Sequence, residues 1–406
     1  MTRYFRSAGL VALSLAFAVS AAACGSDKDS PSDGGDAPTG PIVIGAAIAK
    51  SGFVSAYDMP SYNSFKLRVD EINAAGGING REIELIENDT KSVIDRGGQA
   101  AQELIDKGAE VMLVSCDFDF GSPAAAVAQK AGLVSISLCA SSPKFGAQAI
   151  GDKAFSFQPS VGNQAAVLAT FAMSKGWDTA FVLLDDTLAY TRGMNSAFVD
   201  FYEELGGSVA DEDSFKNDDS SIATQISAIE AADPDVILMN SYPPGGASAL
   251  RQIRAAGIDT PAIAGEAFDG TYWTDAVPGL SDFYISTDAT IFGDDINPAV
   301  NEWAAAYEEK YDEAPSKGQS VMGYVVAQGL EKALEDTKGV TDGDTLAAAL
   351  EAFKDVELIT GPVSFSDSEH IPLNSPLVIM QYTDGQPKYV ETVTPEVQVE
   401  LTDGVG

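Results

Sequence analysis

DEINAAGGINGREIELIE, residues 70–87, holds the end of a helix, a glycine turn and a strand. Apolar residues recur at helical spacing up to the turn, and the glycines at 76–77 end the helix. From residue 81 to 87 apolar and polar side chains alternate, which is typical of a strand. The stretch therefore predicts a helix that returns the chain to a new strand. The apolar stripe of this helix is Phe65, Val69 and Ile72.

Outward from this stretch, short apolar strands alternate with helices. Pro60 is expected to begin the helix that ends at residue 76, and Ser122 with Pro123 is expected to begin another. Parallel neighbouring strands need a crossover connection, so this order predicts a parallel sheet with helices on both faces. The strands expected in this first lobe cover residues 42–49, 83–86, 111–115 and 134–138.

The same order begins again after residue 159, and a hairpin is expected at Asp384 and Gly385. We therefore predict an α/β fold of two doubly wound parallel-sheet lobes, joined by a three-crossing hinge, with the ligand cleft between them. Crossings are expected near residues 158, 288 and 361. Lobe 1 would contain residues 41–157 plus 289–360, and lobe 2 residues 158–288 plus 361–406. The second lobe's strands are expected at 179–184, 236–240 and 262–265, with helices near 165–174, 194–205, 222–231 and 247–256, and a helical block covers 297–354.

Residues 1–23 have the layout of a secretory signal peptide. Their apolar run of roughly 13 residues is shorter than the ~20 that a membrane-spanning helix needs. Cys24 follows the small residues directly, as in the lipobox of bacterial lipoproteins, and residues 24–40 have the composition of a flexible tether. We expect an extracytoplasmic protein anchored to the cell membrane by a lipid on Cys24. The alternatives are plain cleavage after Ala23 and an unmodified thiol.

The charge of the chain excludes one class of partner. There are 60 acidic and 24 basic residues, which give a formal charge of -36. Such a chain repels phosphate backbones, so nucleic acid is not expected as a partner. The acidic runs at 211–213 and 218–219 lack the ligand spacing of a calcium loop and predict a solvated face. No metal and no cofactor is expected.

Ligands of open parallel sheets bind beyond the carboxyl ends of the strands. The residues at these positions are short hydroxyls, carboxylates and aromatic residues, which suit a small polar ligand. The alternative is that each merely caps the helix that follows it. The candidates are Ser51, Cys116, Asp117 and 139–142 in the first lobe, and Asp185, Asp186, Ser241, Tyr242 and Glu266 in the second.

Four segments resemble one known family. DEINAAGGING (70–80), AKSGFVSAY (49–57), LRQIRAAGI (250–258) and AGEAFDG (264–270) follow in the order of the type I periplasmic binding proteins of the leucine/isoleucine/valine-binding family. That family contains ABC transporter substrate-binding lipoproteins. The resemblance implies an amino acid or a related amine-bearing metabolite as ligand, closure of the hinge around it, and ABC permease subunits as partners.

The resemblance also implies roles for single residues. The ligand's carboxylate would bind at the position of Asp117 and at Cys139, Ala140 and Ser141, while Glu266 would take its ammonium group. Asp117 departs from the family's pattern, which has a hydroxyl residue at this position. Its carboxylate would repel the ligand's carboxylate, because two carboxylates ~4 Å apart repel by around 4 kcal/mol at an effective dielectric of 20. The aromatic residues expected to close the cleft are Tyr57, Tyr190 and Tyr242.

Two other functions remain as alternatives. A binding protein of this kind can serve a receptor as a ligand sensor. Ser141 and Lys144 also form an S-x-x-K motif of exported serine acyl-transfer enzymes, but no K-T-G motif follows. The sole histidine, His370, lies in a stretch expected to be exposed and offers little as a general base. We therefore do not expect an enzyme.

Cys116 and Cys139 end neighbouring predicted strands. Adjacent strands lie ~4.8 Å apart, and cysteines joined by a disulfide have Cα separations of about 4.4–6.8 Å. A disulfide is therefore expected, and the alternative is a pair of buried thiols.

Overall fold

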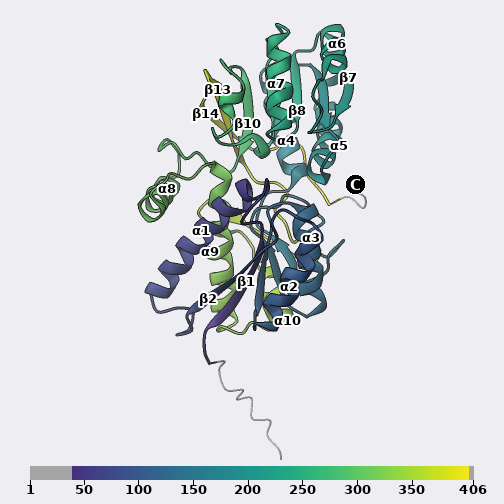
Figure 1. Ribbon diagram of the computed structural model, residues 1–406. Helices are drawn as coiled ribbons and strands as arrows, with labels where there is room; N and C mark the ends of the chain where they lie inside the picture. Colours follow the sequence, from purple (N-terminus) through teal and green to yellow (C-terminus); the bar gives the residue numbers. More distant parts are fainter. Residues whose placement is uncertain (1–38, 402–406) are drawn as a thin grey trace, which may run out of the picture. The chain divides into compact units, whose positions relative to one another are not determined.

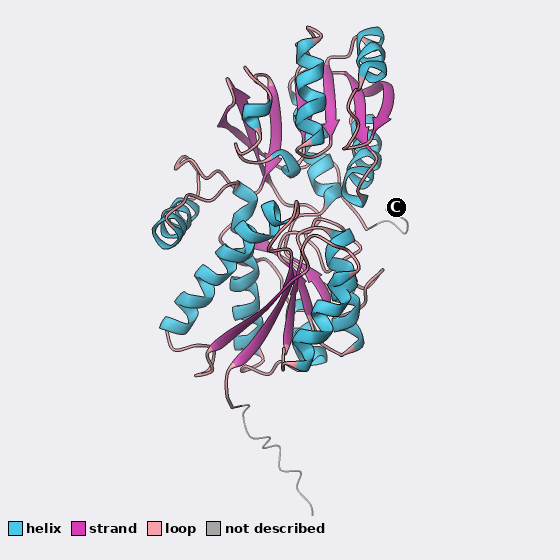
Figure 2. Ribbon diagram, in the orientation of Figure 1, coloured by secondary structure: helices cyan, strands magenta, loops and turns pink. Residues whose placement is uncertain are grey.

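The computed structural model describes residues 39–401, so the predicted signal peptide, Cys24 and the tether up to residue 38 lie outside the described residues. The first lobe contains a parallel sheet with the strand order β2-β1-β3-β4-β5. Figures 1 and 2 show this sheet with helices on both of its faces. Its strands are β1 (Ile42–Ile48), β2 (Ile83–Asp89), β3 (Val111–Val114), β4 (Ser135–Ser137) and β5 (Ala154–Ser156).

Side chains of β1 alternate between the two faces of this sheet. Ile44 and Ile48 belong to the core that the sheet shares with α1 and α9, whereas Ala47 packs in the core beside α2 and α3. Figure 1 shows α1 with α9, and α2 with α3, as the two helical layers. The helices are α1 (Ser55–Ala74), α2 (Arg96–Asp106), α3 (Phe118–Lys130), α8 (Pro298–Tyr311), α9 (Val321–Asp336) and α10 (Gly343–Glu351).

The second lobe contains a sheet with the order β14-β13-β10-β9-β8-β6-β7, in which β13 and β14 are antiparallel. Asp384 and Gly385 form the predicted hairpin turn with φ angles of 50° and 74°. The two-lobed α/β fold is thus confirmed. Its strands are β6 (Thr179–Asp185), β7 (Ser208–Phe215), β8 (Val236–Asn240), β9 (Ala262–Ala264), β10 (Phe283–Thr287), β13 (Leu377–Thr383) and β14 (Gln386–Val393), and its helices are α4 (Val161–Ser174), α5 (Ala189–Glu204), α6 (Ala223–Ala232) and α7 (Gly245–Ala255).

Both predicted helix starts were wrong. Helix α1 begins at Ser55 and contains Pro60 in its second turn. Helix α3 begins at Phe118, and Asp117 is its N-cap residue. The rule that proline occupies the first helical turn placed both starts about five residues too late. In α3 the side chain of Asp117 caps the helix and sets its start, whereas Val54 before α1 makes no side-chain cap.

Strands β5, β7 and β10 were not predicted, and β7 shows why. The acidic run at 211–213 lies in β7, an edge strand whose side chains are largely exposed. Charged side chains protect an edge strand from pairing with another chain, so the strand and the predicted solvated acidic face are the same surface.

The predicted third crossing also needs correction. Val363, in the short strand β12 (Gly361–Val363) that pairs with β11 (Val356–Leu358), packs with Phe365 in the core of the first lobe. The chain therefore crosses between Phe365 and β13, not at residue 361. There it runs beside the first crossing, since Ser156 N donates to His370 O and Ser160 N to Pro372 O, at 2.9 and 2.8 Å.

His370 is buried, with 1% of its surface exposed, which corrects the predicted exposure. Its ring stacks on Phe155 with 4.0 Å between the ring centroids, and its Nδ1 lies 2.9 Å from Ala154 O. The polar neighbours in the sequence therefore misled the prediction. Between residues 39 and 401, no helix combines the length and apolar character that crossing a membrane requires.

Candidate ligand pocket between the lobes

A pocket with a cavity volume of about 60 Å³ lies where residues of both lobes meet. A single water needs about 10–15 Å³ of such space, so the pocket has room for a short chain of a few non-hydrogen atoms. Its wall is mostly aromatic and apolar, with a few polar groups, as in other small-molecule sites. The lining residues are Phe53, Val54, Tyr57, Cys116, Asp117, Phe118, Ser141, Ser142, Leu188, Tyr190, Tyr242, Glu266, Ala267 and Gln319.

Six of the nine predicted ligand residues line this pocket. They are Tyr57, Asp117, Ser141, Tyr190, Tyr242 and Glu266. The other three lie elsewhere. The Ser51 hydroxyl donates to Asp89 Oδ2 at 2.9 Å, and Cys139 is bonded to Cys116. Ala140 N donates to Ser137 Oγ at 2.8 Å, so this N–H is occupied within the lobe.

Glu266 begins a short 3₁₀ helix at the carboxyl end of β9, and 4% of its surface is exposed. Gln158 Nε2 donates to Glu266 Oε2 at 2.7 Å and to Asp288 Oδ2 at 2.9 Å. One amide group therefore serves two carboxylates. Burial, followed by repulsion from Asp288, raises the pKa of Glu266 well above its usual value. Burial likewise raises the pKa of Asp288. The cluster thus favours a protonated carboxyl until a cation arrives.

Gln158 and Asp288 follow β5 and β10, and they were missed as site residues because neither of these two strands was predicted. They lie at the predicted first and second crossings, and their hydrogen bond joins these two segments. A polar residue at a predicted crossing was the signal that could have identified both.

Asp117 occupies the other side of the pocket, at the start of α3. Its Oδ1 accepts hydrogen bonds from Asp119 N at 2.9 Å and from Phe120 N at 3.4 Å, as an N-cap residue does. Burial, and to a lesser extent the neighbouring Asp119, raises the pKa of Asp117 to about 7. The capping role and the pocket-lining role therefore both apply to this residue.

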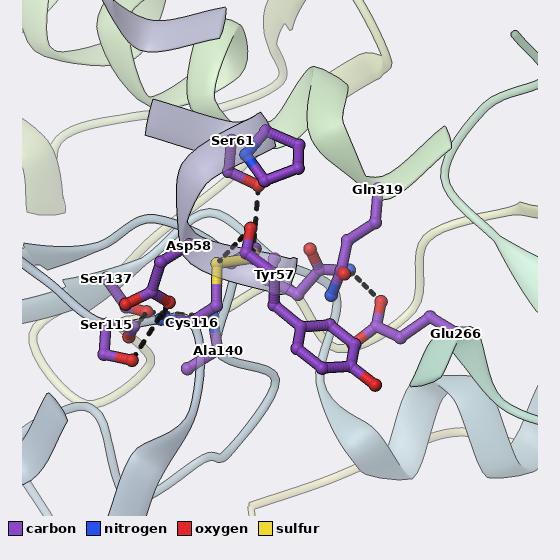
Figure 3. The surroundings of a disulfide bond; sticks show 12 residues. Tyr57, Asp58, Ser61, Ser115, Cys116, Ser137, Ala140, Glu266 and Gln319 are labelled. Atoms are coloured by element: carbon purple, nitrogen blue, oxygen red, sulfur yellow. Dashed lines mark hydrogen bonds between the residues drawn. A yellow bond between two sulfur atoms is a disulfide. The ribbon is translucent and has the colours of Figure 1, made fainter. Parts of the chain in front are cut away.

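Aromatic side chains join the lobes around the pocket. Phe53 stacks on Tyr242 with 6.1 Å between the ring centroids. The Tyr57 hydroxyl donates to Ala267 O at 3.2 Å, and Tyr272 in turn donates to the Tyr57 hydroxyl. Figure 3 shows Tyr57 on the same side of the disulfide as Glu266 and Gln319.

Lys317 is fully buried behind this wall and was not predicted. Its Nζ lies 3.6 Å from the centroid of the Tyr57 ring and has no hydrogen-bond partner among the described residues. Burial lowers the pKa of Lys317 to about 7, against the opposing effect of Asp269 and Glu266. Nothing in the residues around position 317 of the sequence pointed to this placement.

The structure joins Cys116 and Cys139 in a disulfide, with 4.3 Å between their Cα atoms. Cys116 N donates to Asp58 Oδ1 at 2.8 Å, and the Cys116 side of the bridge lines the pocket. Figure 3 shows Asp58 with Ser115 and Ser137 beside the bridge, away from Glu266.

The S-x-x-K motif does not form a nucleophile and base pair in this structure. Lys144 Nζ lies 5.9 Å from the centroid of the Phe118 ring, and within residues 39–401 no hydrogen bond joins it to Ser141. A serine nucleophile needs its base within hydrogen-bonding reach. In the same residues, no group of histidine, cysteine or acidic side chains is arranged to hold a metal ion.

The fold and the pocket define a two-lobed α/β protein that holds a small molecule between its lobes. Residues 41–387 match the family described as periplasmic binding protein. The Leu/Ile/Val-binding protein homolog 3 of Brucella melitensis biotype 1 is 24% identical over 351 residues, which cover 85% of this chain and 92% of the relative.

Solved structures share the fold. The substrate-binding protein LivJ of Streptococcus pneumoniae, in complex with isoleucine, has a TM-score of 0.77 at 23% identity and covers 87% of this chain and 100% of its own. A solute-binding protein of R. palustris, in complex with benzoate, has a TM-score of 0.73 at 18% identity and covers 89% of this chain and 98% of its own. This chain belongs to the periplasmic binding protein family, as a type I solute-binding protein of the Leu/Ile/Val-binding group. Proteins of this family act outside the cytoplasm, and they bind solutes rather than catalyse reactions.

Proposed function

We propose that this protein captures an amino acid or a related amine-bearing metabolite and delivers it to the permease of an ABC importer. The observation that carries the ligand class is the buried Glu266 in the pocket wall, which has no ion-pair partner among the described residues. A buried carboxylate is costly until a cation pairs with it. An ammonium group of the ligand supplies that cation.

The relatives support this ligand class. One is named for leucine, isoleucine and valine, and LivJ was solved with isoleucine. The benzoate complex indicates that the same fold also serves ligands without an amine. The ligand class of this protein is therefore inferred from the residues of its own pocket. A ligand sensor for a receptor is a weaker proposal, since no observation in the pocket favours it.

We also propose how the protein is organised. The lobes meet at crossings near residues 158 and 288 and within 366–376, and these segments bend when a ligand joins Glu266 to the first lobe. Cys24 carries the lipid that holds the protein at the membrane. Mass spectrometry of the mature protein tests the lipid, because an acylated Cys24 differs in mass from a free thiol.

A thermal-shift panel of amino acids, amides, polyamines, sugars and aromatic acids tests the ligand class. A ligand at a hundred times its Kd stabilises the fold by about 2.7 kcal/mol. We expect amine-bearing ligands to give this shift and Glu266→Gln to abolish it. Glu335→Gln, an exposed exchange of the same kind, is the matched control and should keep the shift. A sugar that binds equally well to the Glu266→Gln variant contradicts the proposal.

A further inference from the structure

The charged side chains that line the pocket are all acidic. Asp117 and Glu266 face it from different lobes, and its lining includes no lysine, arginine or histidine within the described residues. An α-amino acid brings one ammonium group and one carboxylate. The pocket therefore matches one end of such a ligand and opposes the other.

Asp117 has an oxygen to offer a ligand. Its Oδ1 caps α3, while Oδ2 has no hydrogen-bond partner within residues 39–401. The neighbouring charges that act on Asp117 are the carboxylates of Asp119 and Asp58, which repel rather than neutralise it. A ligand cation beside Oδ2 would leave the cap intact and supply the missing positive charge.

Gln319 provides an independent observation. It lines the pocket with 4% of its surface exposed, and its Oε1 has no hydrogen-bond partner among the described residues. Buried polar atoms nearly always have a partner. An N–H donor of the ligand would satisfy this acceptor, next to Glu266 in the pocket wall.

The rest of the wall suits a short apolar chain between two cationic ends. Phe53, Phe118 and Tyr242 supply ring faces, which attract both alkyl groups and cations. The cavity volume of about 60 Å³ favours a short chain.

We propose that the ligand is a short aliphatic diamine. One ammonium group binds Glu266 and Gln319 in the wall formed with the second lobe, and the other binds Asp117 in the first lobe. This inference rests on the proposed function, because it adds a second cationic end to the amine that Glu266 takes. It also gives closure a physical cause, since one ligand neutralises a carboxylate on each lobe.

Calorimetric titration of the protein with 1,4-diaminobutane, butylamine and L-leucine tests the inference. We expect the diamine to bind more tightly than butylamine by about tenfold or more, as a charge-assisted hydrogen bond allows. In Asp117→Asn the affinity for the diamine should fall to that for butylamine, whereas the affinity for butylamine should change little. Asparagine is as good an N-cap residue as aspartate, so α3 keeps its start.

Asp342→Asn is the matched control, because Asp342 caps α10 far along the chain and is exposed to solvent. It should retain the preference for the diamine. If L-leucine binds the wild-type protein and Asp117→Asn equally well but does not bind Glu266→Gln, the diamine inference is wrong and the proposed function still stands. Failure of every amine to bind the wild-type protein overturns both.

Discussion

The Asp58 carboxylate shows how one residue organises the first lobe's side of the pocket. It is fully buried and accepts hydrogen bonds from Ala49 N at 2.7 Å, Cys116 N at 2.8 Å and Ser115 Oγ at 3.0 Å. It therefore ties the ends of β1 and β3 to α1, the helix that carries Tyr57. Burial nevertheless raises the pKa of Asp58 to about 6, because three hydrogen bonds only partly replace water.

We expect Asp58→Ala to destabilise the protein by about 2–6 kcal/mol, since it leaves two buried backbone N–H groups unpaired at about 1–3 kcal/mol each. Urea unfolding followed by circular dichroism measures the change. Asp336→Ala, on the exposed end of α9, should lie within about 0.5 kcal/mol of the wild type. A loss at Asp58 as small as that at Asp336 would show that water satisfies these donors.

At the scale of residues, the strand-end rule predicted the pocket well where a pocket-lining residue closely follows a predicted strand, as Asp117 and Glu266 do. It failed for Ala140, whose N–H is bound by Ser137 inside the lobe. It could not find Gln319 or Lys317, because they lie in the segment between α8 and α9 and reach the site only through tertiary packing. Sequence periodicity carries no information about such contacts.

At the scale of elements, the disulfide fixes the ends of β3 and β4 beside the pocket. It closes a loop with a sequence separation of 23. Closing a loop of that size lowers the entropy of the unfolded chain and so stabilises the folded protein by about 3 kcal/mol. We expect the double variant Cys116→Ser with Cys139→Ser to lose about that much stability and to bind ligand more weakly.

Two measurements check this prediction. Labelling of the unfolded, unreduced protein with a thiol reagent should leave positions 116 and 139 unmodified, and uptake at both would remove the disulfide. Urea unfolding of the double serine variant should match that of the reduced wild-type protein, because both lack the bond for the same reason.

Elements with strong apolar periodicity, such as β1, β6 and β8, were predictable to within a residue or two. Strand β7 was not, since its sequence SVADEDSF is mostly acidic and exposed, and only its pairing with β6 makes it a strand. The starts of α1 and α3 were also mispredicted. In α3, the capping hydrogen bonds of Asp117 decide the start, and they become visible only once the backbone is known.

At the scale of the whole molecule, the acidic charge and the buried carboxyls act in the same direction. Burial raises the pKa of Asp58 to about 6 and that of Asp117 and Asp288 to about 7, above the value of about 3.9 in an unfolded chain. Between pH 4 and 7 the folded state therefore holds more protons than the unfolded state. By linkage, the free energy of unfolding falls as the pH rises through this range. The formal charge of -36 adds self-repulsion that also grows with pH.

We therefore expect the ligand-free protein to melt several degrees higher at pH 5.5 than at pH 8. Between these two pH values the loss from Asp58, with its pKa near 6, is about 1 kcal/mol, and the loss from Asp117, with its pKa near 7, is about 2 kcal/mol. Lys317, whose pKa is lowered to about 7, opposes these losses by about 1 kcal/mol, because its folded-state ammonium loses its proton in the same range. Melting curves at both pH values, in about 0.15 M and about 0.5 M NaCl, separate the effect of the buried carboxyls from that of surface repulsion. Salt screens surface charges far more than buried ones. The difference that persists in high salt should shrink in Asp117→Asn and remain in Asp342→Asn. A melting temperature that rises from pH 5.5 to pH 8 would contradict the raised pKa values of these buried carboxyls.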